Sequence, residues 1–297
     1  MDRDTFIIFV YCLVEEHYRA LTQRQALRHG GFEPELTDPE VITMEICGEY
    51  WKLHAETDLF DYFRDHYRHF FPKLSDRTLF ARQAANLCWL KARLQQRLVH
   101  LSGQASDPVQ PIDTVPLPVC TYTRAGRDRC FVGLADFGHC AAKRLDYYGF
   151  KLGLRVSRCG MITAAPLLAA RTHDINHTGA LIEGFSGLVP ADKGFLDAFR
   201  QSLYQQRQGV RLIVPTRKNM AAKATSALER ACGRWRRIVE TVGSQLTERF
   251  GVTRIRVRDL WHFQHRLIRK ILSHTVAVFL NLQLGRAPLD LDGLVSS

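Results

Sequence analysis

The sequence predicts an α/β protein in two parts, an all-helical domain over residues 1–105 and a mixed sheet flanked by helices over residues 106–297. Three observations predict this. Apolar residues recur every three or four positions up to about residue 100, which is helical spacing. The stretch SGQASDPVQP, residues 102–111, is rich in turn formers and indicates a linker. Beyond it, short apolar runs alternate with helical segments, as is typical of mixed α/β sheets.

Four helices are predicted in the first part. The first spans Phe6 to Tyr18, and Thr37-Asp38-Pro39-Glu40 has the capping-box spacing that opens the second. The third runs from Leu59 to Phe71, where a proline follows. Ser75 is the expected cap of a longer fourth helix that continues to Leu94. Short helices and polar turns permit a helix-turn-helix, but this segment is nearly neutral, so dimerisation is as good an alternative as DNA binding.

The second part should contain three strands, a helix, a strand, a helix, a strand and a long helix. The expected bounds are strands 111–120, 148–156 and 161–170, helix 174–185, strand 188–191, helix 196–206, strand 210–215 and helix 233–250. Thr172 or Asp174 is the expected cap of the first of these helices. The stretch 121–146 is rich in Arg, Gly and His and is expected to be a surface loop over a working face.

Composition excludes several classes of protein. A chain of 297 residues with 46 % apolar content can bury a large core, yet no apolar run is long enough to span a bilayer. Eight scattered cysteines without a CxxC pair indicate neither a zinc ribbon nor a secreted disulfide framework, so we expect reduced thiols in a cytoplasm. The net charge is +11, and residues 215–270 carry 14 Lys and Arg against 4 Asp and Glu. Such a block favours binding to nucleic-acid phosphates, although a solvated surface or an acidic partner would also suit it.

Three acids are candidates for catalysis. Asp113 lies inside an apolar strand, where an unpaired carboxylate is costly. Asp192 lies where a strand ends on a glycine-containing turn. Glu240 shares a face of the long helix with Arg236 and Arg237, away from a stripe of apolar residues. Three converging carboxylates would suit a pair of Mg²⁺ ions. A solvated ion pair is the simpler interpretation of Glu240 alone, and the spacing does not prove that the acids meet.

These residues resemble the DDE transposases of bacterial insertion sequences, most closely the insertion sequence 982 family. The resemblance runs from about residue 36 to 281, and its most specific motif is the last one. The matching motifs are Ile112-Asp113-Thr114-Val115-Pro116-Leu117-Pro118, Tyr148-Gly149-Phe150-Lys151-Leu152, His173-Asp174, Ala191-Asp192-Lys193-Gly194-Phe195, Pro215-Thr216-Arg217-Lys218-Asn219 and Arg236-Arg237-Ile238-Val239-Glu240-Thr241-Val242-Gly243-Ser244-Gln245-Leu246. Related transposases often have a Tyr and a Lys flanking the Glu where this chain has Gly233 and Thr247.

The resemblance implies a ribonuclease H-like catalytic domain in which Asp113, Asp192 and Glu240 hold two Mg²⁺ ions, with Mn²⁺ as a substitute. It implies an endonuclease that cuts the ends of its own insertion sequence and joins the 3′-hydroxyl ends to target DNA. The implied partners are double-stranded DNA and a second copy of the chain in a synaptic homodimer, without a membrane, at the bacterial nucleoid. The residues expected to contact DNA are Arg217, Lys218, Arg236 and Arg237.

Several alternatives stay open. The chain could be a host-adopted nuclease that cuts without strand transfer, or a DNA-binding protein whose acids are structural. Asp174 is either a fourth acid at the metals or a helix cap. A zinc site could be imagined from Cys130, His139 and Cys140. Two further basic groups either contact the DNA backbone or are solvated, namely Arg124, Arg127 and Arg129, and on the last helix His262, His265, Arg266, Arg269 and Lys270.

Overall fold

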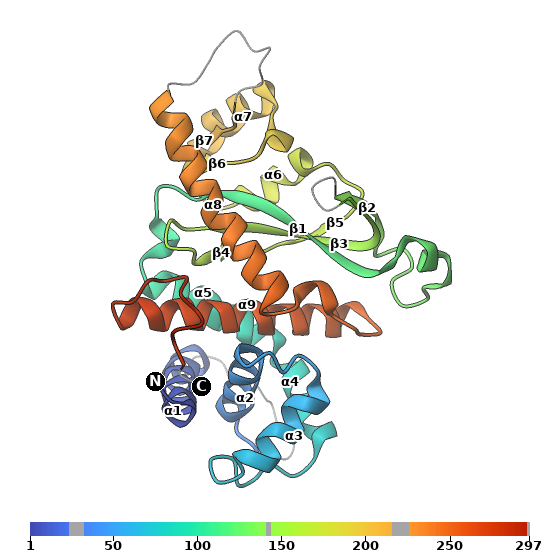
Figure 1. Cartoon of the computed structure of the whole chain (residues 1–297), viewed down its shortest axis with the longest axis vertical. Helices are drawn as coiled ribbons and strands as arrows, with labels where there is room; N and C mark the ends of the chain where they lie inside the picture. The colour runs from blue at the N-terminus through green and yellow to red at the C-terminus, as the bar shows by residue number, and fades with distance from the viewer. Residues whose placement is uncertain (24–32, 141–143, 216–225, 296–297) are drawn as a thin grey trace. The chain divides into compact units, whose positions relative to one another are not determined.

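The computed structural model describes residues 1–23, 33–140, 144–215 and 226–295 (Figure 1). The chain divides into two compact units. A helical unit comprises Met1–Leu101 and Glu248–Ser297, and an α/β unit comprises Ser102–Thr247. The first division lies close to the boundary expected near residue 105. The C-terminal tail differs from the expectation, because it groups with the N-terminal helices and not with the sheet.

The helical unit contains the last long helix of the chain. Its elements are α1 (Arg3–Thr22), α2 (Asp38–Tyr50), α3 (Glu56–His66), α4 (Arg77–Asn86), α5 (Cys88–Leu101), the 3-10 turn η5 (Val252–Arg254) and α9 (Leu260–Gln283). Helix α9 packs against α2 and α5 (Figure 1), and every residue from 269 to 281 is buried. A helix that is buried on all sides over this length needs neighbours on all sides, and α2 and α5 provide them within this unit.

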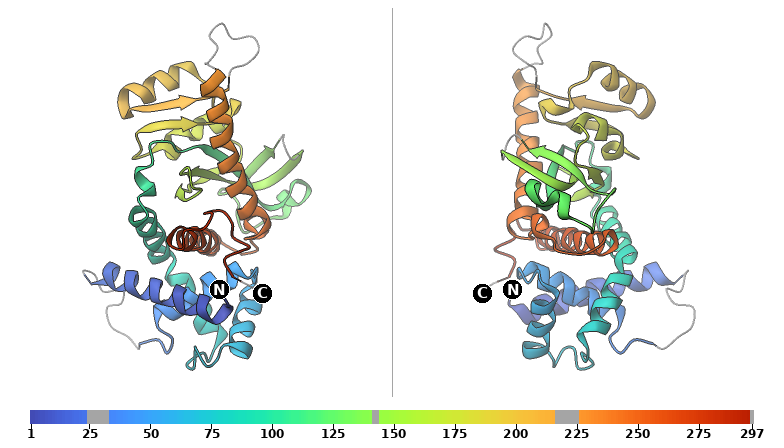
Figure 2. Two further views of the ribbon diagram at one scale, coloured as in Figure 1. Left: turned by 60° about the vertical axis from the view of Figure 1, so that its left-hand side comes forward. Right: turned by 90° about the vertical axis from the view of Figure 1, so that its right-hand side faces the viewer.

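The two ends of the described chain meet in the helical unit. The amino group of Met1 donates to the carbonyl of Leu294 at 3.1 Å, and the N and C marks lie side by side in both views of Figure 2. Among the helices described, none combines the length and the apolar composition that crossing a bilayer requires.

One predicted helix cap is confirmed and another is wrong. Thr37 caps α2 in a complete capping box, in which its backbone N–H donates to Glu40 at 2.6 Å. Ser75 does not cap α4, because its hydroxyl donates to Glu35. Asp76 caps the helix instead, accepting at 2.9 Å from a backbone N–H three residues further on. A carboxylate is the better partner for the positive end of a helix.

The third helix ends earlier than predicted, and aromatic side chains pack against one another where it ends. Helix α3 stops at His66, before the predicted end at Phe71. Tyr67 stacks on Trp51 with ring centroids 5.8 Å apart, and Phe71 packs edge-on against Phe63 at 5.4 Å. These ring contacts stabilise the irregular segment that follows the helix. The predicted fourth helix is likewise divided, into α4 and α5.

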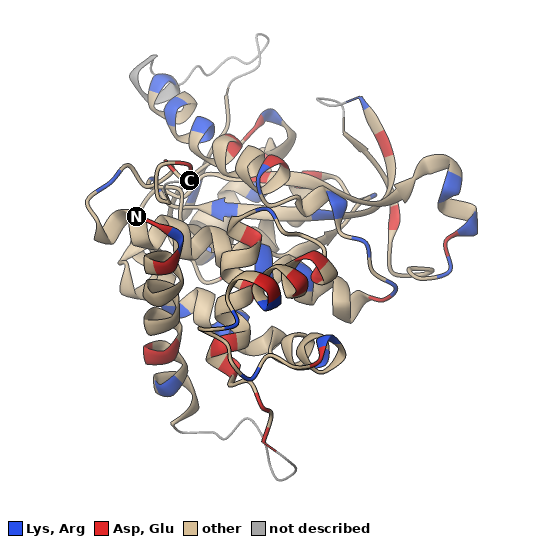
Figure 3. Ribbon diagram, turned by 60° about the horizontal axis from the view of Figure 1, so that its bottom comes forward, with Lys and Arg blue, Asp and Glu red and all other residues tan. Residues whose placement is uncertain are grey.

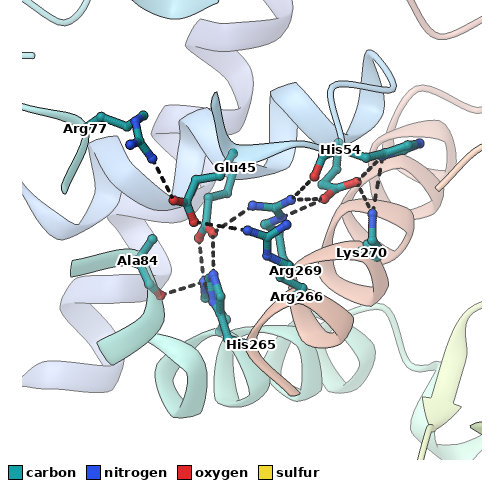
Figure 4. A network of polar contacts seen from close by, with 11 residues as sticks. Glu45, His54, Arg77, Ala84, His265, Arg266, Arg269 and Lys270 are labelled. Atoms are coloured by element: carbon teal, nitrogen blue, oxygen red, sulfur yellow. Dashed lines mark hydrogen bonds and ion pairs between the residues drawn. The ribbon is translucent and has the colours of Figure 1, made fainter. Parts of the chain in front are cut away.

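Buried charges connect α9 to α2 and α5 (Figure 4). Glu49 of α2 accepts from Arg269 Nε at 2.6 Å and from Lys270 Nζ at 2.8 Å. Glu45, one turn earlier, accepts from Lys91 of α5. None of these five side chains is more than 2 % exposed. Ions this deeply buried are tolerated only when they are paired and hydrogen-bonded.

This network corrects the expectation that the basic residues of the last helix face solvent or DNA. His265, Arg269 and Lys270 are buried and face the acids of α2. The other two, His262 and Arg266, form ion pairs within the same unit. The signal in the sequence was the pair of glutamates one turn apart in the otherwise apolar α2, since buried acids need basic partners.

The α/β unit is built around one central strand. Its elements are β1 (Ile112–Thr121), β2 (Asp136–Cys140), β3 (Leu145–Val156), β4 (Ile162–Ala164), β5 (Leu167–Ala169), α6 (Asp174–Ile182), β6 (Gly187–Pro190), α7 (Ala198–Gln208), β7 (Val210–Ile213), α8 (Ser226–Glu248) and the 3-10 turns η1 (Gln104–Ser106), η2 (Tyr122–Arg127) and η4 (Lys193–Phe195). Strand β3 pairs antiparallel with β1, β2, β4 and β5. The mixed α/β order is as predicted with two differences: the predicted strand 161–170 is divided into β4 and β5, and the expected loop 121–146 contains η2 and β2.

Two parallel strands form a separate small sheet next to the segment that precedes β1. Strands β6 and β7 pair in parallel, and Val109, just before β1, forms a parallel bridge with Leu188 of β6. A core cluster that includes Ile112, Leu181 and Val189 fixes α6 against β1 and β6. These contacts bring the end of β6 toward the start of β1.

Helix α8 packs on the sheet that contains β1 through its apolar stripe. Val239, Val242 and Leu246 are buried, as the spacing predicted. A Cβ on Gly243 would lie 3.3 Å from a methyl group of Val115 on β1, so the helix backbone runs close over this strand. The face of α8 that carries Glu240 is thereby turned outward.

Candidate active site

Three neighbouring elements position the predicted acids. Asp113 is the second residue of β1, Asp192 lies two residues after the end of β6, and Glu240 lies on the outward face of α8. The Asp192 and Glu240 side chains are 54 % and 50 % exposed, while Asp113 is half-buried. Because β6 and α8 both adjoin β1, residues from distant parts of the chain reach one edge of the sheet.

Arg236 joins two of the acids. Its Nη2 lies 3.2 Å from Asp192 Oδ1 and 3.2 Å from Glu240 Oε1. The predicted pair of Arg236 with Glu240 on one helix face is confirmed, whereas its contact with Asp192 was not foreseen. Arg237 is exposed and donates to the carbonyl of Gly233 at 3.4 Å. The two arginines therefore differ in role, since one neutralises the acids and the other faces solvent.

The pKa of Asp113 reports that the acids are close together. Burial is the main cause that raises this pKa to about 6, and repulsion from Asp174, Asp192 and Glu240 raises it further. The backbone N–H of Thr114, 2.8 Å from Asp113 Oδ1, acts in the opposite direction. Charge repulsion of this kind acts only between groups that are near one another. Asp174, Asp192 and Glu240 thus lie within electrostatic range of Asp113.

Asp174 is fixed by two side chains of the sheet. Its Oδ1 accepts from Lys151 Nζ at 2.9 Å and from Thr114 Oγ1 at 3.2 Å. The expectation that Thr172 or Asp174 caps α6 is wrong, because the N-cap is His173 and no side chain caps the helix. The lysine and the hydroxyl hold the carboxylate instead. A signal for this pair was available, since Lys151 is the one charged residue in the run YGFKLGL.

The remaining predicted DNA contacts are only partly described. Arg217 and Lys218 lie outside the described residues. Figure 3 shows Lys and Arg on successive turns of the described part of α8. The exposed ones are Arg230, Arg234 and Arg237. The zinc alternative gains no support, because His139 pairs with Asp146 at 2.7 Å.

The donor atoms at the site fit a hard divalent cation by their chemistry. They are carboxylate oxygens, and their mutual repulsion is the kind that a cation relieves. Within the described residues, however, no group of three or more His, Cys, Asp and Glu side chains could hold a metal ion as it stands. The guanidinium of Arg236 lies 3.2 Å from an oxygen of both Asp192 and Glu240, so a cation held by these two acids would compete with it.

The α/β unit is thus a domain in which strands and helices bring carboxylates from distant segments of the chain near one another. The family model described as a transposase DDE domain matches residues 103–260, which is more than half of the chain. The chain belongs to this transposase family. Neither a curated protein nor a solved structure matches it. The matched segment contains Asp113, Asp174, Asp192 and Glu240.

Replacing Asp113 by Asn is expected to stabilise the metal-free protein at neutral pH. A carboxyl group whose pKa is raised on folding contributes stability that is lost as the pH rises through about 6. The gain from Asp113→Asn should therefore be absent near pH 3.8 and reach at most about 3 kcal/mol above pH 6. Urea unfolding in EDTA at several pH values measures it. Asp146→Asn, at a side chain that is 65 % exposed, is the control; an equal gain there would contradict the explanation.

Proposed function

We propose that the chain is a Mg²⁺-dependent transposase. It cuts the phosphodiester bonds at the ends of an insertion sequence and transfers the freed 3′-hydroxyl ends to target DNA. The observation that carries this proposal is the coupling of Asp113, Asp192 and Glu240 within the segment that matches the transposase domain: Arg236 contacts both Asp192 and Glu240, and both acids raise the pKa of Asp113. Repulsion among these acids lowers the stability of the fold and contributes nothing to packing. Such an arrangement is typical of a functional site.

The acids have distinct roles in this proposal. Asp113, Asp192 and Glu240 would hold two Mg²⁺ ions, or Mn²⁺ in their place, which supply activation of the attacking water or 3′-hydroxyl and stabilisation of the leaving oxygen. Asp174, held by Lys151 at 2.9 Å, would add its carboxylate to the electrostatic field at Asp113. Charge of this kind favours a cation at the site over a neutral, protonated Asp113.

The chain's arginines suit the handling of DNA. Arg236 neutralises two acids in the free protein, and it becomes available to a DNA phosphate when it leaves them. Arg237 is exposed on the same helix, and we assign Arg217 and Lys218 to DNA contacts from their sequence positions alone. A planar guanidinium binds phosphate oxygens in pairs, which suits a site where a phosphodiester must be oriented.

The finer family assignment remains part of this proposal. The motifs around Asp113, Asp192 and Glu240 favour the insertion sequence 982 family and a ribonuclease H-like domain. The antiparallel pairing of β1 with β3, together with the parallel bridge from Val109, just before β1, to Leu188 of β6, supports such a domain. Joining two element ends to one target requires two active sites, so we expect a homodimer in the synaptic complex.

A strand-transfer assay tests the proposal. The purified protein is mixed with labelled duplexes taken from the DNA that flanks its gene, a supercoiled target plasmid and Mg²⁺. We expect cleavage at the element end, followed by a labelled product joined to the plasmid, and neither reaction in EDTA. Duplexes of scrambled sequence are the control.

The alternatives give different products. Cleavage without any joined product would contradict transposition and favour a nuclease. Binding without cleavage, in Mg²⁺ and in Mn²⁺, would contradict an enzyme altogether and favour a DNA-binding protein. Analytical ultracentrifugation of the protein with two end duplexes tests the dimer, which predicts one complex with two chains.

A further inference from the structure

The helical unit has a basic cleft of its own. It has a volume of about 240 Å³. Among the side chains that line it are Arg3 at the start of α1, Trp51 and Lys52 just after α2, Arg249 just before η5, and Asp292 in the C-terminal tail. Three of these five are cations and one is an anion. Four segments of the chain thus combine to give the cleft an excess of positive charge.

Hydrogen-bond donors outnumber acceptors among the described side chains of the cleft, where Asp292 supplies the one carboxylate. Arginine, lysine and tryptophan side chains donate hydrogen bonds and accept none. Trp51 Nε1 and Arg249 Nε are buried and have no hydrogen-bond partner among the described residues. A buried donor without an acceptor costs about 1–3 kcal/mol. A ligand that suits this cleft therefore brings acceptor atoms and negative charge.

Aromatic rings hold the two arginines in place. The guanidinium carbon of Arg3 lies 5.6 Å from the centroid of the Trp51 ring, and Arg3 Nη1 also donates to Tyr62 at 2.6 Å. The guanidinium carbon of Arg249 lies 4.4 Å from the centroid of the Tyr50 ring. Stacked guanidinium groups lose less freedom on binding and present paired donors to phosphate oxygens.

Lys52 occupies the cleft at the cost of backbone strain. Its φ is +67°, a left-handed conformation that costs a residue with a Cβ roughly 1 kcal/mol or more. The turn is fixed by hydrogen bonds from Lys52 N to the carbonyl of Glu49 at 3.0 Å and from Leu53 N to that of Gly48 at 2.8 Å. Glycine would adopt this conformation without strain. A lysine at this position is consistent with a use for its charge.

Asp292 shows what kind of group the cleft accepts. It accepts a hydrogen bond from Arg249 Nη1, although its own side chain is 91 % exposed. An exposed carboxylate gains little from such a pair and is readily displaced. Its oxygens occupy Arg249 in the way that a phosphate oxygen would.

We propose that this cleft binds a backbone phosphate of DNA, with Arg3, Lys52 and Arg249 as its ligands and Asp292 as the internal group that the phosphate displaces. The choice of DNA as the source of the phosphate rests on the proposed function, and the net charge of +11 agrees with it. The helical unit would then hold DNA through its backbone, without reading bases.

The salt dependence of DNA binding tests the proposal. Fluorescence anisotropy of a labelled duplex gives Kd at several salt concentrations for the full-length protein and for Lys52→Gln, which keeps most of the side-chain stem. One lost phosphate contact should reduce the slope of log Kd against log salt by about 0.9 and weaken binding about 3- to 10-fold near 0.15 M salt. Asp292→Asn should tighten binding about 2- to 5-fold, because it frees Arg249. Lys73→Gln, at an exposed lysine of the same unit, is the matched control.

Each outcome of these binding measurements either supports or overturns the proposed phosphate site. A Lys52→Gln protein that has wild-type thermal stability, and whose slope is no different from that of Lys73→Gln, would overturn the proposal. Inorganic phosphate that competes with DNA in the wild type but not in Lys52→Gln would support it. Phosphate that binds the cleft without any effect of Lys52 on the DNA slope would assign the cleft to small anions and overturn the DNA assignment. The readout is binding alone, so a protein that binds DNA without cutting it refutes only the proposed function.

Discussion

Asp113→Asn is expected to abolish DNA cleavage and strand transfer while leaving DNA affinity unchanged. The side-chain oxygen of Asn can still accept from the N–H of Thr114, so the strand should keep its conformation. What is lost is a negative charge among four acids. If that charge helps to hold a divalent ion worth several kcal/mol to the transition state, the rate should fall by about 10³-fold or more. Single-turnover cleavage of an end duplex measures the rate, and anisotropy measures the affinity.

Two further variants test whether the loss of cleavage is specific to the carboxylate of Asp113. Asp146→Asn removes a carboxylate of the same unit from an exposed ion pair and should cleave at the wild-type rate. Asp174→Asn keeps the acceptor for Lys151 but removes the charge, and it should reduce cleavage less than Asp113→Asn does. Cleavage by Asp113→Asn within a few-fold of the wild type would show that Asp113 is structural. A loss of DNA binding together with cleavage would point to misfolding.

The guanidinium of Arg236 forms ion pairs with two of these acids. One nitrogen placed 3.2 Å from both Asp192 and Glu240 means that the free protein neutralises part of its own site. A bound cation and this guanidinium would compete for the same oxygens. The site is therefore expected to bind DNA phosphate and divalent ions together, since the arginine that leaves the acids gains a new anionic partner.

Local patterns were sufficient for most of the elements. The stripe of Val239, Val242 and Leu246 was visible because helical burial repeats every three to four residues. The capping box at Thr37 was visible because it consists of side chains three positions apart. Strand β2 was missed because Asp136–Cys140 lacks alternation and is mostly exposed, so its pairing with β3 decides its conformation.

The buried ion pairs and the contacts at the candidate site depend on residues that are far apart in sequence, so local patterns did not predict them. The sequence offered Glu49 and Lys270 as two ordinary charged residues, and only the packing of α9 on α2 shows that they are buried against each other. The same holds for Asp192 and Arg236 at the candidate site. The convergence of the three acids could be predicted from the resemblance, but the bridging position of the arginine could not.

Glu49→Gln is expected to destabilise the helical unit by about 3–5 kcal/mol, because it removes the acid that pairs with Lys270 and the nearer of the two acids that pair with Arg269. Urea unfolding followed by tryptophan fluorescence suits this test, since three of the four tryptophans belong to the helical unit. Glu15→Gln is the matched control. It breaks an ion pair on the surface of α1 and should cost less than about 0.5 kcal/mol.

The pH dependence of the stability loss caused by Glu49→Gln identifies the physical cause of that loss. Burial raises the pKa of Glu49, but Arg269, Lys270 and His54 outweigh burial and lower it to about 2. A carboxylate whose pKa is lowered on folding gives its full stabilisation above pH 4.5 and loses it as the pH falls toward 2. The stability difference between the wild type and Glu49→Gln should therefore shrink over that range. A difference that is constant with pH would point to altered packing.

A double variant separates the lost charge from the lost contact. If the penalty of Glu49→Gln comes from unpaired cations, then Glu49→Gln with Lys270→Met should be more stable than Glu49→Gln alone, because one of the two cations has been removed. Lys270→Met alone should be destabilising, since Glu49 then keeps only part of its counter-charge. Additive losses in the double variant would show that the network does not act as a charge pair, and α9 would then owe its place to apolar packing.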